Sequence, residues 1–217
     1  MSHAAPHHFP AEHHVAELDR LMAIPAVAER MARRPEINTE FDVPDLGGYS
    51  IDGQRVYIDR HAKLDRVEMA GIVEHEHTEK ILIDVLSYPY AQAHEMATVA
   101  EHRLVSDPKA YEKRLKPFIK RSEHEKITKP PLDLDCRPYY ESPNKQDLII
   151  LAHLARLGVK DAQHEHQKLS HASVHYGPGH APEFCNKCEH FQAKSHCELV
   201  QDPISKSGWC KLWTRKK

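Results

Sequence analysis

Apolar residues recur at helical spacing along most of the chain before its last fifty or so residues. Leu18, Leu21 and Met22, for example, share one face of an expected helix that Pro25 interrupts. The same three- and four-residue spacing continues further along, bounded by residues that start and stop helices. It predicts helices over residues 13–34, 68–86, 90–106, 109–121 and 146–157, the last ending near Gly158.

Residues 49–58 follow a different pattern, because apolar and polar side chains alternate on both sides of Asp52-Gly53. Alternation with a period of two is typical of a half-buried strand, and an Asp-Gly pair is a strong signal for a tight hairpin turn. No internal repeat is visible in the sequence. We therefore expect a mainly α protein with one β-hairpin, which is an α+β fold, followed by a small loop-rich module.

Changes in composition divide the chain into four parts. Residues 1–43 hold a histidine-rich start and a helix, and residues 44–128 hold the hairpin and several helices. Lys129-Pro130-Pro131 begins a linker, and with the helix that follows it forms the third part, residues 129–169. The last part, residues 170–217, is too short to bury a large core by itself. It therefore needs another source of stability.

Composition excludes a membrane-spanning protein, and the overall charge argues against a nucleic-acid-binding protein. No apolar run reaches the roughly 18 residues needed to span a bilayer. Thirty basic and 32 acidic side chains give a formal net charge of -2, so the overall charge does not favour nucleic acid as a partner. The first 30 residues also lack the basic start and apolar stretch of an export signal. We therefore expect a cytoplasmic protein that binds neither membranes nor nucleic acids.

The last part of the chain contains Cys185, Cys188, Cys197 and Cys210, at the spacing of a metal site. Four sulfur ligands, two of them one turn apart and two from separate loops, can hold either a tetrahedral Zn²⁺ or a 4Fe-4S cluster. Disulfides fit the chain less well, since it has no secretion signal and an odd fifth cysteine, Cys136. We interpret Cys136 as an ordinary thiol. Zinc ribbons usually contain two Cys-x2-Cys pairs, whereas here only Cys185 and Cys188 form such a pair.

The residues around these cysteines, among them the run Gly208-Trp209-Cys210-Lys211-Leu212-Trp213, resemble the high-potential iron-sulfur proteins. The resemblance covers about residues 170–217. It implies a 4Fe-4S cluster bound by the four cysteines, with Tyr176, Trp209 and Trp213 shielding it from water. Members of that family are usually small exported electron carriers, so in a chain of 217 residues the module is an appendage. A structural zinc ion is the alternative.

A second candidate site lies in the middle of the chain. His75 and Glu79 are four residues apart in an expected helix, so they share a face and can reach one metal ion, while Glu76 could polarise a bound water. The next expected helix offers His94 and Glu101, which are seven residues apart and again share a face. The sequence thus contains four candidate ligands for Zn²⁺ or another divalent metal, and one candidate general base.

This hairpin with two helices resembles the zincin metallopeptidases, which carry His-Glu-x-x-His on a helix beneath a strand. Glu79 stands here in place of the second histidine. The segment, about residues 45–106, is also similar to uncharacterised bacterial and prophage-encoded proteins without a known activity. The alternative is that histidines and glutamates on solvated helix faces share these spacings by chance.

Three functions remain open at this point. The first is binding of a 4Fe-4S cluster with a one-electron redox or cluster-sensing role and an unknown redox partner. The second is a metallohydrolase with an attached cluster module. The third is a phage-associated structural or assembly protein that the cluster stabilises, which would place the protein in a virion.

Overall fold

The computed structural model describes residues 12–122, 127–141, 145–165, 171, 174–192 and 195–216, so the histidine-rich start up to residue 11 lies outside it. The helices are α1 (Glu12–Met22), α2 (Pro25–Met31), α3 (Arg66–Leu86), α4 (Tyr90–His102), α5 (Pro108–Ser122), α6 (Arg137–Tyr140), α7 (Lys145–Arg156) and α8 (Lys160–Glu165). The strands are β1 (Glu36–Asn38), β2 (Gly47–Tyr49), β3 (Arg55–Ile58), β4 (Gly177–Pro178), β5 (Phe191–Gln192), β6 (His196–Cys197) and β7 (Gly208–Trp209), and a 3₁₀ turn spans Cys185–Lys187.

The expected long helices are present as α3, α4, α5 and α7. The expected helix 13–34 is divided into α1 and α2, because Pro25 begins a new helix at a position where its missing N–H costs nothing. The sequence pattern does not predict β1, α6 or α8. These elements have three, four and six residues, so they are too short to show a hydrophobic period.

The predicted hairpin is confirmed, with β2 and β3 antiparallel and Gly48 opposite Tyr57. Its turn contains Gly53 at φ +66°, a left-handed conformation that favours glycine. β1 adds a third strand parallel to β3, which gives the strand order β1-β3-β2. The chain is therefore a mixed α+β protein. At the other edge of β2, Asp135 N donates to Tyr49 O at 2.9 Å.

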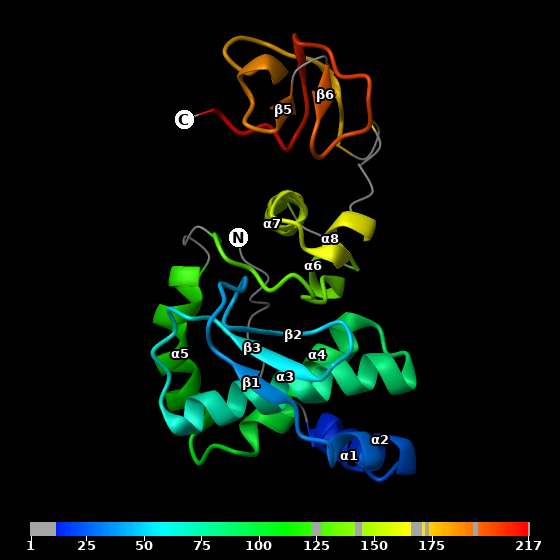
Figure 1. The fold of residues 1–217 in the computed structure, drawn as a ribbon, viewed down its shortest axis with the longest axis vertical. Helices are drawn as coiled ribbons and strands as arrows, with labels where there is room; N and C mark the ends of the chain where they lie inside the picture. The colour runs from blue at the N-terminus through cyan, green and yellow to red at the C-terminus, as the bar shows by residue number, and fades with distance from the viewer. Residues whose placement is uncertain are drawn as a thin grey trace.

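Helix α3 lies beneath the sheet and beside α4 (Figure 1). It begins at a capping box formed by Asp65 and Glu68 and ends at Ser87, which has a left-handed conformation two residues before Pro89. A buried apolar cluster joins α3 and α4 to α1. Because this packing holds α3 and α4 firmly together, polar side chains on the two helices keep a fixed geometry.

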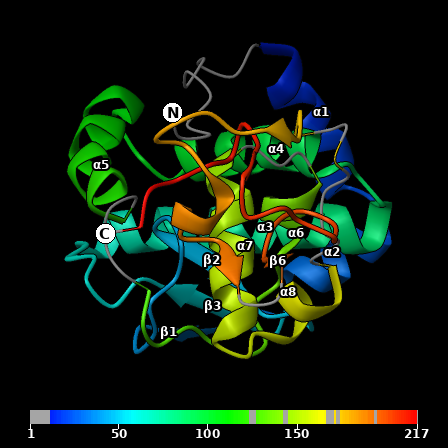
Figure 2. The same ribbon diagram turned by 90° about the horizontal axis from the view of Figure 1, so that it is seen from above.

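Helix α7 lies between the α3–α4 layer and the tail, which is residues 174–216 (Figures 1 and 2). Its Leu151 and Leu154 belong to a core shared with β3 and α6. Its Ala152 belongs to a different core, formed mainly by the tail. Arg156 Nη1 also donates to Glu198 Oε1 at 3.1 Å. One helix thus contributes to the cores of both halves of the molecule.

The tail contains two pairs of two-residue strands, β4 with β7 and β5 with β6, joined by turns and loops. It is loop-rich, as the sequence predicts. Tyr176 lies against Gly208 so closely that a Cβ at this position would overlap the tyrosine hydroxyl. In the part of the chain that the structure describes, none of the helices is long and apolar enough to cross a bilayer.

Candidate metal centres

One face of α3 lines a cavity of about 180 Å³. Ile72, His75, Glu76 and Glu79 contribute to this wall, at the three- and four-residue spacing that keeps side chains on one side of a helix. The other walls come from α4, α5, α6 and residues 45–49. The structure therefore brings the predicted histidines and carboxylates of two helices together in one cavity.

Three of the predicted ligand atoms form a triangle, which we call the helix site. His94 Nδ1 lies 2.9 Å from Glu79 Oε2 and 3.1 Å from His75 Nε2. His75 Nε2 lies 3.6 Å from Glu79 Oε2. Ligand atoms about 2.0 to 2.1 Å from a tetrahedral zinc ion are about 3.4 Å from one another, so the triangle has the size of such a site. Among the described residues, no other three ligand atoms of this kind lie within 4.8 Å of one another.

The charges around the helix site fit cation binding. Burial would raise the pKa of Glu79, but hydrogen bonds with His75 and His94 outweigh burial and lower the pKa to about 2. Burial and the nearby charge of Glu79 raise the pKa of Glu76 to about 8. A divalent cation at the helix site would stabilise the Glu76 carboxylate and bring its pKa down again. Glu76 is thus a half-buried carboxyl group whose charge is sensitive to what the helix site holds.

Glu101, which the sequence suggests as a fourth ligand, lies behind His75 and outside the triangle. Its Oε2 accepts a hydrogen bond of 2.8 Å from His75 Nδ1, the ring nitrogen that points away from the helix site. The physical reason is the distance along α4. Glu101 is seven residues beyond His94, which is about 10 Å along a helix axis, so only the His94 end of the face reaches the triangle.

Sequence reasoning does not identify the tyrosines of this cavity. The Tyr49 hydroxyl donates to Glu79 Oε1 at 2.9 Å, which leaves Oε2 for the triangle. The Tyr90 hydroxyl lies 3.5 Å from His94 Nδ1, and Tyr139 also lines the cavity. These tyrosines come from β2, α4 and α6. No local sequence pattern connects the three elements, so only the folded chain reveals their common location.

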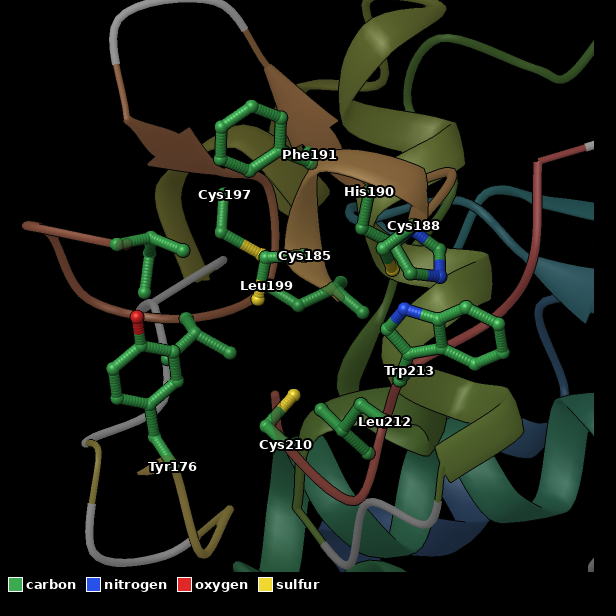
Figure 3. Close-up of a pocket in the computed structure, with 12 residues that line it drawn as sticks. Tyr176, Cys185, Cys188, His190, Phe191, Cys197, Leu199, Cys210, Leu212 and Trp213 are labelled. Atoms are coloured by element: carbon green, nitrogen blue, oxygen red, sulfur yellow. The ribbon is translucent and has the colours of Figure 1, made fainter. Parts of the chain in front are cut away.

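The four cysteines of the tail line a second cavity, which we call the cysteine site (Figure 3). All four are buried and free of disulfides, and Figure 3 shows their sulfur atoms directed towards the middle of the cavity. The remaining lining is mainly apolar or aromatic and consists of Tyr176, His190, Phe191, Leu199, Val200, Ile204, Leu212 and Trp213. The structure thus brings together four sulfurs that are spread over 26 residues of sequence, Cys185 to Cys210.

Two of the three predicted shielding residues, Tyr176 and Trp213, line the cysteine site. Trp209 does not, and its ring centre lies 6.1 Å from that of His180, outside the lining. Trp209 directly precedes Cys210, and successive side chains of an extended chain point to opposite sides. Because Cys210 faces the cavity, Trp209 faces away from it. The structure therefore does not place Trp209 where it could shield the site.

The cysteine sulfurs are spaced more widely than the atoms of the helix site. All four cysteines are among the described residues, and no three of their sulfurs lie within 4.8 Å of one another. Four thiolates around one tetrahedral zinc ion, at about 2.3 Å each, would be about 3.8 Å apart. Burial and the neighbouring Cys210 and Cys188 raise the pKa of Cys185 to about 12. Thiolates at this site therefore need a compensating cation.

The fifth cysteine, Cys136, lies in the core between α6 and α7, and its side chain has no exposed surface. Its thiol donates to Leu134 O at 3.7 Å. Burial, together with the charges of Asp161 and Asp135, raises the pKa of Cys136. A protonated, buried thiol is unreactive. This environment agrees with the interpretation of Cys136 as an ordinary thiol.

A comparison of this chain with known protein families, curated proteins and solved structures finds no match. The resemblances to high-potential iron-sulfur proteins and to zincins therefore stay predictions. The geometry of the helix site and of the cysteine site is what indicates a function.

Proposed function

We propose that the tail binds one 4Fe-4S cluster through Cys185, Cys188, Cys197 and Cys210, and that the protein has a one-electron redox or cluster-sensing role. The observation that carries this proposal is the cysteine site, where four buried sulfurs point into one cavity with a mainly apolar lining. Thiolate sulfur is the ligand by which proteins hold such clusters.

The spacing of the sulfurs supports a cluster in preference to a single zinc ion. A cubane cluster places four iron atoms between the thiolates and so holds the sulfurs further apart than one ion does. Sulfurs of which no three lie within 4.8 Å of one another fit the larger group. A tail with so little core would also gain folding free energy from the metal.

Hydrogen bonds to the sulfurs support a redox role. Thr214 N donates to Cys188 Sγ at 3.4 Å. Burial raises the pKa of Cys197, and the backbone N–H groups of Leu199 and Val200 oppose this effect by donating to its sulfur. When bound, the cluster supplies a one-electron couple. Donors to the sulfurs stabilise negative charge and raise the potential of that couple, and the apolar lining keeps water away from it.

Protein purified without oxygen and without added metal tests this proposal. We expect about four iron and four sulfide ions per chain, a visible charge-transfer band and an electron paramagnetic resonance signal in one redox state. A reversible midpoint potential would support the redox role. A cluster without a reversible midpoint potential would favour the structural or assembly role. About one zinc with negligible iron per chain would contradict cluster binding.

A second function, hydrolysis at a divalent metal centre, is favoured by the triangle of His75 Nε2, Glu79 Oε2 and His94 Nδ1 in the same cavity as Glu76. Two imidazoles and one carboxylate are the ligands of many catalytic zinc sites, which leave a fourth position open for water. The metal would supply a Lewis acid at that position. Glu76 would accept a proton from the water and return it to the leaving group.

Three substitutions test the second function. His75→Ala should remove a divalent ion that survives loss of the cluster, because it deletes one ligand. Glu76→Gln should retain this ion and abolish hydrolysis of a panel of peptide and ester substrates, because an amide cannot accept the proton. His77→Ala is the matched control, since His77 is buried on the same helix but does not line the cavity. Full hydrolysis by Glu76→Gln, or retention of the ion by His75→Ala, would contradict the assignment.

A further inference from the structure

His75 makes two different contacts through its two ring nitrogens. Nε2 belongs to the helix site, 3.1 Å from His94 Nδ1, whereas Nδ1 lies 2.8 Å from Glu101 Oε2. The ring nitrogens of an imidazole point away from each other, so a carboxylate bonded to Nδ1 is not a ligand of the ion that Nε2 binds. Since a carboxylate accepts, Nδ1 carries a proton, and Nε2 is the nitrogen whose lone pair can bind a metal once the ring is neutral.

Glu101 is itself held by a residue from a third helix. The Tyr111 hydroxyl of α5 donates to Glu101 Oε1 at 2.5 Å. Tyr111 is 1% exposed and Glu101 7%, so water does not compete with this contact. The side chains of His75, Glu101 and Tyr111 therefore form a buried chain of hydrogen bonds from α3 through α4 to α5.

The backbone of α3 leaves room for this chain of contacts. Gly71, one turn before His75, packs against the Tyr111 hydroxyl so closely that a Cβ at position 71 would overlap it. A larger residue would therefore push the hydroxyl away from Glu101. Glycine in the middle of a helix is destabilising relative to alanine, and the close approach of Tyr111 gives a reason for its presence here.

We propose that Glu101 and Tyr111 are positioning residues of the helix site, which fix the tautomer and the orientation of the His75 ring so that Nε2 faces Glu79 and His94. This inference rests on the second function proposed above, because it assigns the residues that hold one of the metal ligands in place. A carboxylate on the far nitrogen of a metal-binding histidine also makes the ring a better donor. Tyr111 acts only through Glu101.

Cobalt(II) binding to the full chain tests the inference. Co²⁺ held by nitrogen and oxygen has visible bands but lacks the sulfur-to-cobalt bands that cysteine ligands would add. The chain contains 19 histidines, so the signal assigned to the helix site is the part that His75→Ala removes. We expect Tyr111→Phe and Glu101→Gln to weaken this binding roughly 10- to 100-fold, with unchanged band positions at saturating Co²⁺.

Tyr57→Phe is the matched control, because Tyr57 is also buried and donates to an aspartate, Asp133, at 2.7 Å but does not line the cavity. It should bind Co²⁺ as the wild type does. A thermal unfolding curve for each metal-free variant separates lost affinity from lost folding. If Glu101→Gln does not fold, Tyr111→Phe alone decides, since it removes one hydroxyl and leaves every candidate ligand in place.

The possible outcomes separate the two proposals. A wild type without a His75-dependent cobalt signal would contradict the metal centre itself. If the wild type binds Co²⁺ and the Tyr111→Phe variant binds it equally well, only the positioning role is overturned. Shifted band positions in Glu101→Gln would show that Glu101 is a ligand, which would also overturn that role.

Discussion

Trp209 and Trp213 flank Cys210, yet only Trp213 lines the cysteine site. The Trp213 indole N–H donates to Phe184 O at 2.9 Å, which holds the ring at the edge of the cavity. At the scale of single residues, the direction of a side chain thus decides whether it can exclude water from the sulfurs. Composition and spacing treat the two tryptophans alike, whereas the structure separates them.

Replacing Trp213 by Ala should raise the midpoint potential of the bound cluster and speed its loss. The cluster with its four thiolates is more negative after reduction, and water admitted to the cavity stabilises the more negative state. Voltammetry and the decay of the charge-transfer band measure the two effects. Trp209→Ala makes the same change outside the cavity and serves as the control, so equal shifts in both variants would contradict the shielding role of Trp213.

At the scale of elements, β2 approaches α3 very closely beside the helix site. A Cβ at Gly47 would lie 2.7 Å from Glu76 Oε1 and 2.8 Å from Ile72 Cγ2. Both distances are too short for real contacts, so the absence of a side chain at position 47 allows the strand to border the cavity. The strand thereby limits where the Glu76 carboxylate can lie.

Gly47→Ala should therefore displace Glu76 from the water position without removing a metal ligand. We expect the divalent ion to remain and hydrolysis to fall roughly 100-fold, the lower end of what a general base contributes. Metal content and turnover under identical conditions measure this. Gly177→Ala is the control, because nothing lies within 4 Å of a Cβ there. Equal turnover in the Gly47→Ala variant and the wild type would contradict the role of Glu76.

A second contact between elements joins the segment before β2 to residues 128 and 129. Asp42 accepts hydrogen bonds from Thr128 N and Lys129 N, both at 2.7 Å, and from Thr128 Oγ1 at 2.8 Å. Burial would raise the pKa of Asp42, but these bonds and the charge of Arg60 outweigh it and lower the pKa to about 2. The ionised form of Asp42 therefore stabilises the folded protein.

Asp42→Asn should lower the free energy of unfolding at pH 7 by on the order of 1 kcal/mol, because the neutral amide loses the charge-dependent part of these hydrogen bonds. The folded pKa lies below the unfolded one, so this stabilisation is complete above about pH 5 and is lost as the pH falls towards about 2. Urea unfolding of both proteins from pH 7 to pH 3 measures the difference. A difference that stays constant over this range would show that Asp42 does not stabilise the fold through its charge.

At the scale of the whole molecule, α7 contributes to the cores of both halves. Leu151 belongs to the core with β3 and α6, whereas Ala152, one residue later, belongs to the core of the tail. Neighbouring residues of a helix point in different directions, so two apolar faces of α7 pack into two different cores. The tail core contains three of the cysteines themselves, Cys185, Cys197 and Cys210, so a metal bound by them would contribute to the folding free energy of the tail.

Cys210→Ser should unfold the tail and leave the α3–α4 layer folded. Loss of one of four ligands removes much of the metal-binding free energy of the tail, whereas α3 and α4 have a separate apolar core. Hydrogen exchange should accelerate in residues 174–216 and stay slow in α3 and α4. Cys136→Ser, which alters a thiol outside the cysteine site, should leave exchange in the tail unchanged. Slow exchange in the tail of Cys210→Ser would show that the tail folds without the metal.

The sequence by itself determined the elements that depend on local rules. Helical spacing predicted α3, α4, α5 and α7, and the Asp-Gly turn predicted the hairpin. Local spacing also selected His75 with Glu79 and the four cysteines, because side chains four apart share a helix face and close cysteines can share a metal. Each of these patterns depends on residues close together in the sequence, and such local patterns can be recognised from the sequence alone.

Only the tertiary structure decided which residues meet across elements. β1 pairs with β3 across sixteen intervening residues, Thr39 to Gln54, a contact that no local period reveals. Glu101 and Tyr111 lie behind His75, because Glu101 is seven residues beyond His94 along α4 and α5 brings Tyr111 to it. Trp209 lies outside the lining of the cysteine site, because neighbouring side chains of an extended segment point to opposite sides. A metal site needs its donors within a few ångströms of one another, and packing of α3, α4 and α5 determines those distances.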